Sequence, residues 1–158
     1  MIRISIVLGC VLALAGCANL WTASGDAAAQ ERESRQVVEL IGYAQRVAGL
    51  GSDEQQRELN ASSQIFSKDR GAYGRVRLAL VLSLPGTAFS DEPKAAGLLE
   101  PLVSKEATGP MQQFAGLLHT QLAERLREQR RATQLKEQLD ALKDVERKII
   151  EREQARPR

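Results

Sequence analysis

Apolar side chains recur every three or four residues along most of this chain, which is the spacing of one face of an α-helix. The first such stretch predicts a helix from about Glu31 to Ala48, and Gly49 and Gly51 end it. Its apolar face holds Val37, Leu40, Ile41, Ala44, Val47 and Ala48.

The next segment predicts a second helix from Ser52 to about Ser67. Ser52 with Gln55 three residues later has the form of a capping box, in which each side chain bonds an amide of the first turn. The predicted apolar face of this helix holds Leu59, Ser62, Ile65 and Phe66.

A third segment is apolar almost all round and predicts a helix from about Ala72 to Leu84. The length of the run and the Pro85-Gly86 stop favour a helix over a buried strand of the same composition. Since a helix that is apolar on every side must be surrounded by protein, we expect it to be the centre of a small core.

A fourth helix is predicted after Ser90, Asp91 and Glu92, which have the form of an N-terminal cap with Pro93 in the first turn. Its apolar positions are Ala96, Leu99, Leu102 and Val103. The third and fourth helices together predict a helical hairpin.

Thr108, Gly109 and Pro110 begin the last element, and neither glycine nor proline occurs from Leu117 to Arg156. We therefore predict one helix over residues 110–156, whose uninterrupted part of about 40 residues measures about 60 Å at 1.5 Å per residue. A domain of this size cannot bury so long a helix along its whole length.

The apolar pattern of this helix changes partway. Its first part steps by four and suits packing on the preceding hairpin, through Phe114, Leu118, Leu122 and Leu126. After the wholly polar residues 127–131, a heptad seam follows with Glu146 in one position, formed by Ala132, Leu135, Leu139, Leu142 and Ile149. Such a seam requires a partner.

The first 16 residues have the parts of a secretory leader: a basic start at Arg3, an apolar segment and small residues at the end. The apolar segment is shorter than the roughly 20 residues that a spanning helix needs. Leu14, Ala15, Gly16 and Cys17 spell a bacterial lipobox, which predicts cleavage before Cys17 and attachment of lipid to its thiol.

Lipidation at Cys17 predicts a membrane-anchored protein, because several acyl chains together hold a protein almost permanently at about 0.8 kcal/mol per buried CH₂. Residues 17–30 are small and polar and predict a flexible tether. Ala18 follows the cysteine, where an aspartate favours retention in the inner membrane, so we expect the periplasmic face of the outer membrane.

Composition supports an all-α fold: a helical bundle over residues 31–109 and a long C-terminal helix of coiled-coil character over 110–156. Aromatic residues are only 4% of the chain, and a net charge of +2 gives no basic excess for nucleic acid. The two cysteines are Cys10, which leaves with the leader, and Cys17, so the mature chain forms no disulfide of its own.

Little in the sequence points to catalysis. The single histidine, His119, lies inside the last helix without a motif that would make it a base or a metal ligand. Paired carboxylates such as Asp91 with Glu92 suit a helix cap, and no glycine-rich phosphate loop occurs. We therefore expect no enzyme, metal or cofactor other than the covalent lipid.

The best candidate site is the seam formed by Leu135, Leu139, Leu142 and Ile149. Covering these side chains would recover about 25 cal/mol per Å² of apolar surface, which favours binding to another protein. Two alternatives remain open at this point: the seam folds back on the first helix, or it joins two copies of the chain.

The segments RLALVLSLPGTAFSD, LLEPL and especially LKEQLDALKDVERKIIER (residues 135–152) resemble the QseG (YfhG) family of proteobacterial lipoproteins. Members are helical outer-membrane lipoproteins that act with the QseE sensor histidine kinase and the QseF response regulator. The resemblance implies a lipid on Cys17, a partner-binding helix and no catalytic residue. It favours an accessory protein that contacts the kinase's periplasmic domain; the alternative is a structural adaptor in envelope assembly or secretion.

Overall fold

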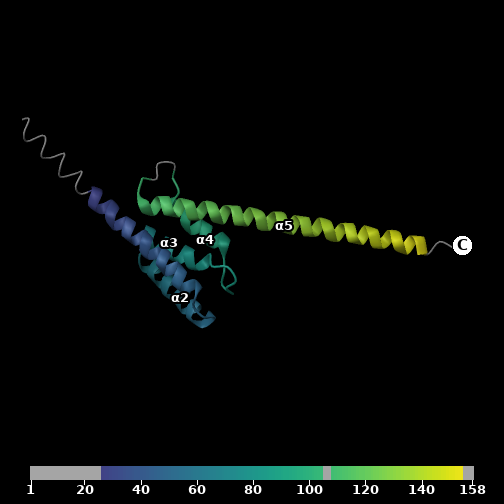
Figure 1. The fold of residues 1–158 in the computed structure, drawn as a ribbon, viewed down its shortest axis with the longest axis horizontal. Coiled ribbons are helices and arrows are strands. Elements are labelled where there is room, and N and C mark those ends of the chain that lie inside the picture. Colours follow the sequence, from purple (N-terminus) through teal and green to yellow (C-terminus); the bar gives the residue numbers. More distant parts are fainter. Residues whose placement is uncertain (1–25, 105–107, 155–158) are drawn as a thin grey trace, which may run out of the picture.

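The computed structural model describes residues 26–104 and 108–154, and within these ranges the chain is all-α, as predicted (Figure 1). A helix over residues 26–48, called the first helix below, precedes four labelled elements and a short 3₁₀ turn. These are α2 (Ser52–Lys68), α3 (Ala72–Leu82), α4 (Glu92–Leu99), η1 (Glu100–Leu102) and α5 (Pro110–Gln154).

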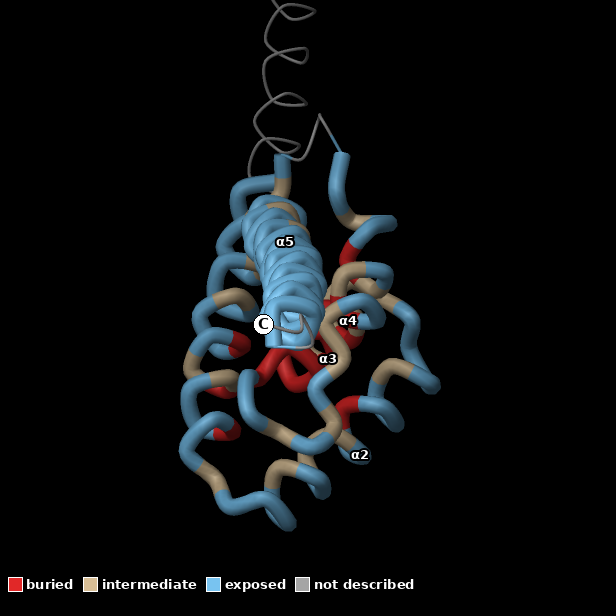
Figure 2. Tube along the Cα trace, turned by 90° about the vertical axis from the view of Figure 1, so that its right-hand side faces the viewer, coloured by how far each residue is buried: buried red, intermediate tan, exposed pale blue. Residues whose placement is uncertain are grey.

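Helix α3 is the centre of the core, as its apolar composition predicted. It packs against α2, α4 and α5, and Figure 2 shows the buried backbone gathered beneath the exposed outer helices. Val76, Ala79 and Val81 are completely buried. The helix ends at Leu82, two residues earlier than predicted, because Ser83 caps it and its hydroxyl bonds the Leu80 carbonyl at 2.9 Å.

The predicted capping box of α2 does not form. The cap residue is Gly51, and Ser52 is already the first helical residue, so its side chain caps no amide. Gln55 instead donates from Nε2 to the Val47 carbonyl at 3.1 Å and ties the start of α2 to the end of the first helix.

The apolar faces of the first two helices differ in part from the prediction. Leu40 and Val47 are buried as expected, but Ile41 and Ile65 are exposed. Ser62 is buried as its place on the predicted face indicated, and Tyr43, which was not assigned to the face, is buried as well. Their burial depends on a polar network between three helices, described below.

Helix α4 begins as predicted, since Asp91 accepts a hydrogen bond from the Lys94 amide at 2.9 Å with Pro93 in the first turn. It is shorter than the pattern suggested: after Leu99 the chain turns into η1, which contains Pro101. Val103 is consequently exposed, and Ala95 is buried beside Leu99.

Helix α5 divides into a packed part and a projecting part. Met111, Ala115 and Leu122 are buried, and Leu126 is the last residue that is not exposed. Every residue from Arg127 to Gln154 is exposed, and Figure 1 shows this part of α5 extending well beyond the other helices. At 1.5 Å per residue the projecting part is about 42 Å long.

The predicted tether over residues 17–30 is wrong at its C-terminal end. The first helix already includes residues 26–30, where the three alanines 27–29 favour helix over a flexible chain. The leader and Cys17 lie outside the described residues. No helix in the described ranges is long and apolar enough to cross a membrane.

Candidate partner-binding surface

The four residues predicted to form the seam all lie exposed on the projecting part of α5. Between 51% and 73% of the surface of Leu135, Leu139, Leu142 and Ile149 is exposed, with Leu142 the most exposed of them. The described chain places no other element over them, since all residues around them on α5 are exposed as well (Figure 2). The seam is therefore an uncovered apolar stripe.

Two further residues widen this stripe. Val145 and Ile150 are exposed by 54% and 46%, and we did not assign them to the seam from the sequence. Their spacing holds the signal: Val145 follows Leu142 by three residues and precedes Ile149 by four. The heptad pattern assigns Leu142, Glu146 and Ile149 to the seam, and it therefore leaves out Val145, the apolar residue beside Glu146.

The seam faces a different direction from the packed face of α5. Each residue of an α-helix turns by about 100°, so Leu135 lies about 140° around the axis from the buried Leu122. A partner helix on the seam would therefore approach from a side that α3 and α4 do not occupy. In the described residues the first helix packs in the core through Leu40 and Val47, not on the seam.

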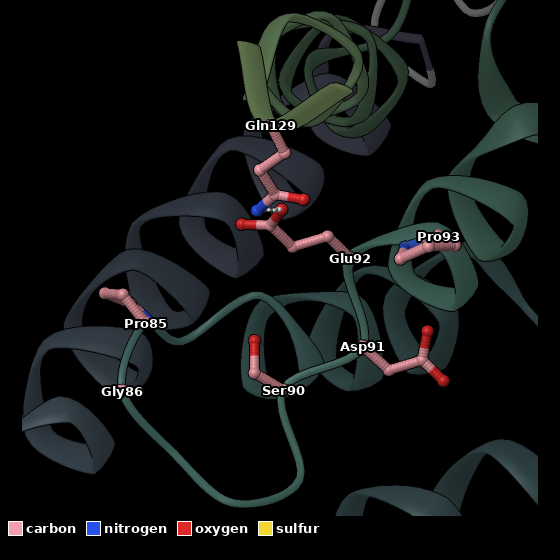
Figure 3. A pocket seen from close by; sticks show the side chains of 7 residues that line it. All are labelled: Pro85, Gly86, Ser90, Asp91, Glu92, Pro93 and Gln129. Carbon is pink, nitrogen blue, oxygen red and sulfur yellow. Dashed lines mark hydrogen bonds between the residues drawn. The ribbon is translucent and has the colours of Figure 1, made fainter. Parts of the chain in front are cut away.

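A polar anchor joins α4 to α5 where the projecting part begins. Gln129 donates from Nε2 to the Glu92 carboxylate at 2.6 Å, as the dashed line in Figure 3 shows, and Arg125 lies 3.8 Å from the same carboxylate. A cavity of about 360 Å³ lies beside this contact. In Figure 3 the Glu92 side chain points to Gln129, whereas Asp91 points away from both.

The groups lining this cavity have structural partners. Asp91 caps α4, Ser90 bonds the Leu82 carbonyl at 3.4 Å, and Glu92 holds α5. The arrangement fixes the base of the projecting helix against the bundle. We assign it an anchoring role, because its acidic groups are already engaged in these contacts.

A second polar group connects three helices inside the bundle. Tyr43 on the first helix donates to Glu58 Oε2 at 2.9 Å, and its hydroxyl lies 2.9 Å from Ser62 Oγ; both partners belong to α2. Arg77 on α3 donates to Ser62 at 3.2 Å and to Glu58 at 3.3 Å. Burial raises the pKa of Tyr43 above its ordinary value, and the hydrogen bond to Glu58 acts in the same direction.

This network explains how a polar face is buried between the helices. Every side-chain nitrogen and oxygen buried in the described residues has a hydrogen-bond partner. Only a weak signal for it is present in the sequence, because members on different helices lie 15 to 34 positions apart along the chain. The one indication of the network in the sequence is Ser62, a polar residue among the apolar positions of the second helix.

The remaining candidates are placed as follows. His119 is half-buried on α5, and no group of three potential metal ligands occurs among the residues that the structure describes. No protein-family model, curated protein or solved structure matches the chain. The exposed seam is consequently the feature of the described chain on which a functional argument rests.

Proposed function

We propose that this protein is a lipid-anchored, non-catalytic accessory partner of a two-component sensor histidine kinase, acting on the periplasmic side. The observation that carries the proposal is the apolar seam from Leu135 to Ile149, exposed on a helix that projects beyond the bundle. The resemblance of residues 135–152 to the lipoprotein family named above supports a kinase as the partner.

The shape of the molecule suits an arm that reaches a partner. The packed part of α5 and the anchor between Glu92 and Gln129 fix the orientation of the projecting part relative to the bundle. The projecting part of α5 is a rigid arm, so it loses little conformational entropy on binding. More of the free energy from the apolar contact therefore contributes to affinity. Leu139 and Leu142 lie near the middle of the arm, where a contacting helix would cover them.

The regulatory step follows from differential binding. An arm that contacts one conformation of the kinase better than the other shifts the population toward that conformation. This mechanism needs no catalytic residue in the accessory protein. It requires only that the kinase present a different surface to the seam in its two states.

The test compares two double variants of α5. Leu139→Glu with Leu142→Glu places charge in the seam, while Gln134→Glu with Ala141→Glu places the same charge at exposed positions outside the seam and its immediate neighbours. We expect the seam variant to reduce kinase output to that of cells lacking the protein, and the control to retain it. Unchanged output in the seam variant, with the protein present at normal amount, would disprove the proposal.

The position of the anchor is tested separately. Replacing Cys17 by Ala removes the thiol that would carry lipid, so we expect loss of metabolic labelling with palmitate and loss of the protein from the outer-membrane fraction. Labelling that persists in this variant would refute lipidation at Cys17.

A photoreactive side chain at Lys143 identifies the partner class. Capture of a kinase periplasmic domain in intact cells supports the signalling function. Capture of a component of envelope assembly or secretion in its place supports a structural adaptor, which the same exposed seam would also suit.

A further inference from the structure

The charges beside the seam are all of one sign. In a heptad description Ala132, Leu135, Leu139, Leu142, Glu146 and Ile149 form the seam, and the positions next to it are 131, 136, 138, 143, 145, 150 and 152. The charged residues among these are Arg131, Lys136, Lys143 and Arg152, which we call the basic flank. All four are exposed.

The acidic residues of the projecting helix lie elsewhere. Of its seven acidic residues, Glu137, Asp140, Asp144 and Glu151 occupy positions that face away from a coiled-coil partner, and Glu128, Glu146 and Glu153 lie on the line of the seam itself. The ion pair that the structure shows within the projecting part joins Arg147 to Asp144 at 3.5 Å, and both residues lie outside the basic flank. The flank therefore presents its positive charge to whatever covers the seam.

A second copy of the chain fits this pattern poorly. In a parallel pair Arg131 of one helix would lie opposite Lys136 of the other, and the two Glu146 carboxylates would meet inside the seam. In an antiparallel pair that aligns Leu139 with Leu142, Lys136 would lie opposite Lys143. Like charges across the interface oppose both arrangements.

A lipid surface also fits poorly. Helices that lie in a membrane interface bury their apolar face among the acyl chains and commonly carry aromatic residues there. Residues 127–154 contain no aromatic residue, and Glu146 lies within the apolar stripe, where it would enter the membrane with the leucines. In a coiled coil, a single charged residue in the seam instead selects a partner with an opposite charge at that level.

We propose that the seam pairs with an amphipathic helix of a partner protein whose flanking positions are acidic and which places a basic residue opposite Glu146. This inference rests on the proposed function in taking the partner to be a protein. It goes further by specifying the chemistry of the surface that the partner presents. The apolar seam supplies contact area, and the basic flank selects among helices that would otherwise bind alike.

The test uses the full mature chain with Cys17 replaced by Ser and two fluorescent peptides of about four heptads. The peptides share the same leucine and isoleucine positions, and one carries Glu while the other carries Lys at every flanking position. Fluorescence anisotropy at low salt should show at least about tenfold tighter binding of the acidic peptide. The difference should narrow at about 1 M salt, where charges more than roughly 3 Å apart are screened.

Two variants isolate the charge from the apolar contact. Reversing all four charges of the basic flank to Glu should invert the peptide preference without changing the fold, because the four side chains are exposed. Lys136→Arg with Lys143→Arg retains the charge and should keep the original preference.

The proposal is overturned if the two peptides bind equally, if neither binds, or if the peptide preference survives reversal of the flank. It is also overturned if the free chain sediments as a dimer that Leu142→Glu dissociates, or if anionic vesicles bind the seam in place of the acidic peptide. These readouts are independent of kinase output. If the two peptides bind equally but the Leu139/Leu142 variant still loses kinase output, this inference fails and the proposed function stands. If the acidic peptide is preferred but the variant keeps full kinase output, the proposed function fails and this inference stands.

Discussion

The guanidinium carbon of Arg77 lies 3.7 Å from the centre of the Tyr43 ring, so a cation on α3 covers an aromatic face of the first helix. The same arginine donates to Ser62 and Glu58 on α2, which also contact the Tyr43 hydroxyl. One side chain thus joins two helices that are neighbours in sequence to the central helix. The contact therefore helps to hold the first helix and α2 against α3.

Replacing Tyr43 by Phe should lower the free energy of unfolding by about 1 to 3 kcal/mol, because buried Ser62 and the Glu58 carboxylate lose a partner. The ring beneath Arg77 remains. Tyr73→Phe is the matched control, since its hydroxyl bonds Glu39 at an exposed site and should change stability by less than about 0.5 kcal/mol. Urea unfolding of both variants measures the difference. Equal losses of stability would show that the buried hydrogen bonds of Tyr43 stabilise the fold no more than the exposed hydrogen bond of Tyr73 does.

The raised pKa of Tyr43 predicts a loss of stability at alkaline pH. The folded protein holds the phenolic proton more tightly than the unfolded chain does, whose tyrosine pKa is about 10. The resulting stabilisation is complete below about pH 10 and disappears as pH rises through the folded pKa. Urea unfolding at about pH 8 and pH 11 should therefore show a steeper decline for the native chain than for Tyr43→Phe. Parallel declines in the two proteins would contradict this assignment.

Gly74 permits the close approach of α3 to the end of α2. A Cβ at this position would lie 2.9 Å from the Asp69 carbonyl oxygen and 3.4 Å from the Phe66 Cα, and neither backbone atom can move independently of its helix. Gly74→Ala should reduce the free energy of unfolding by about 1 to 3 kcal/mol. Gly97, within α4, has open space around it, so Gly97→Ala should stabilise by about 0.5 to 1 kcal/mol. Stabilisation by both substitutions would rule out the tight contact.

The helices were predictable because their signals are local. Runs of apolar residues at helical spacing, Pro93 in a first turn and the absence of glycine and proline from residue 117 to 156 each act within one element. The exposed seam was predictable for the same reason, since Leu135 to Ile149 repeat along a single helix that nothing else in the described chain covers. Its basic flank is likewise a property of one helix.

The misses involve contacts between elements. The burial of Tyr43 depends on where Arg77 and Glu58 lie in space, which no periodicity records. The cap of α2 is Gly51, one residue before the predicted Ser52, and the Gln55 side chain bonds the preceding helix, a contact that no local pattern indicates. Sequence patterns thus indicated which faces are apolar, while side-chain pairing decided which residues on them are buried.

The two parts of α5 predict opposite responses to the loss of a leucine. Leu122 is almost completely buried, so Leu122→Ala should lower the free energy of unfolding by about 2 to 5 kcal/mol through lost contacts and a cavity. Leu142 is 73% exposed, so Leu142→Ala should change the stability of the free protein by less than about 0.5 kcal/mol.

Thermal or urea unfolding at two protein concentrations measures the loss of stability in both variants. A large loss for Leu142→Ala would mean that the seam is covered in the free protein: by another part of the same chain if the loss is independent of concentration, and by a second copy if it grows with concentration. A small loss would leave the seam free for a partner, as the proposed function requires.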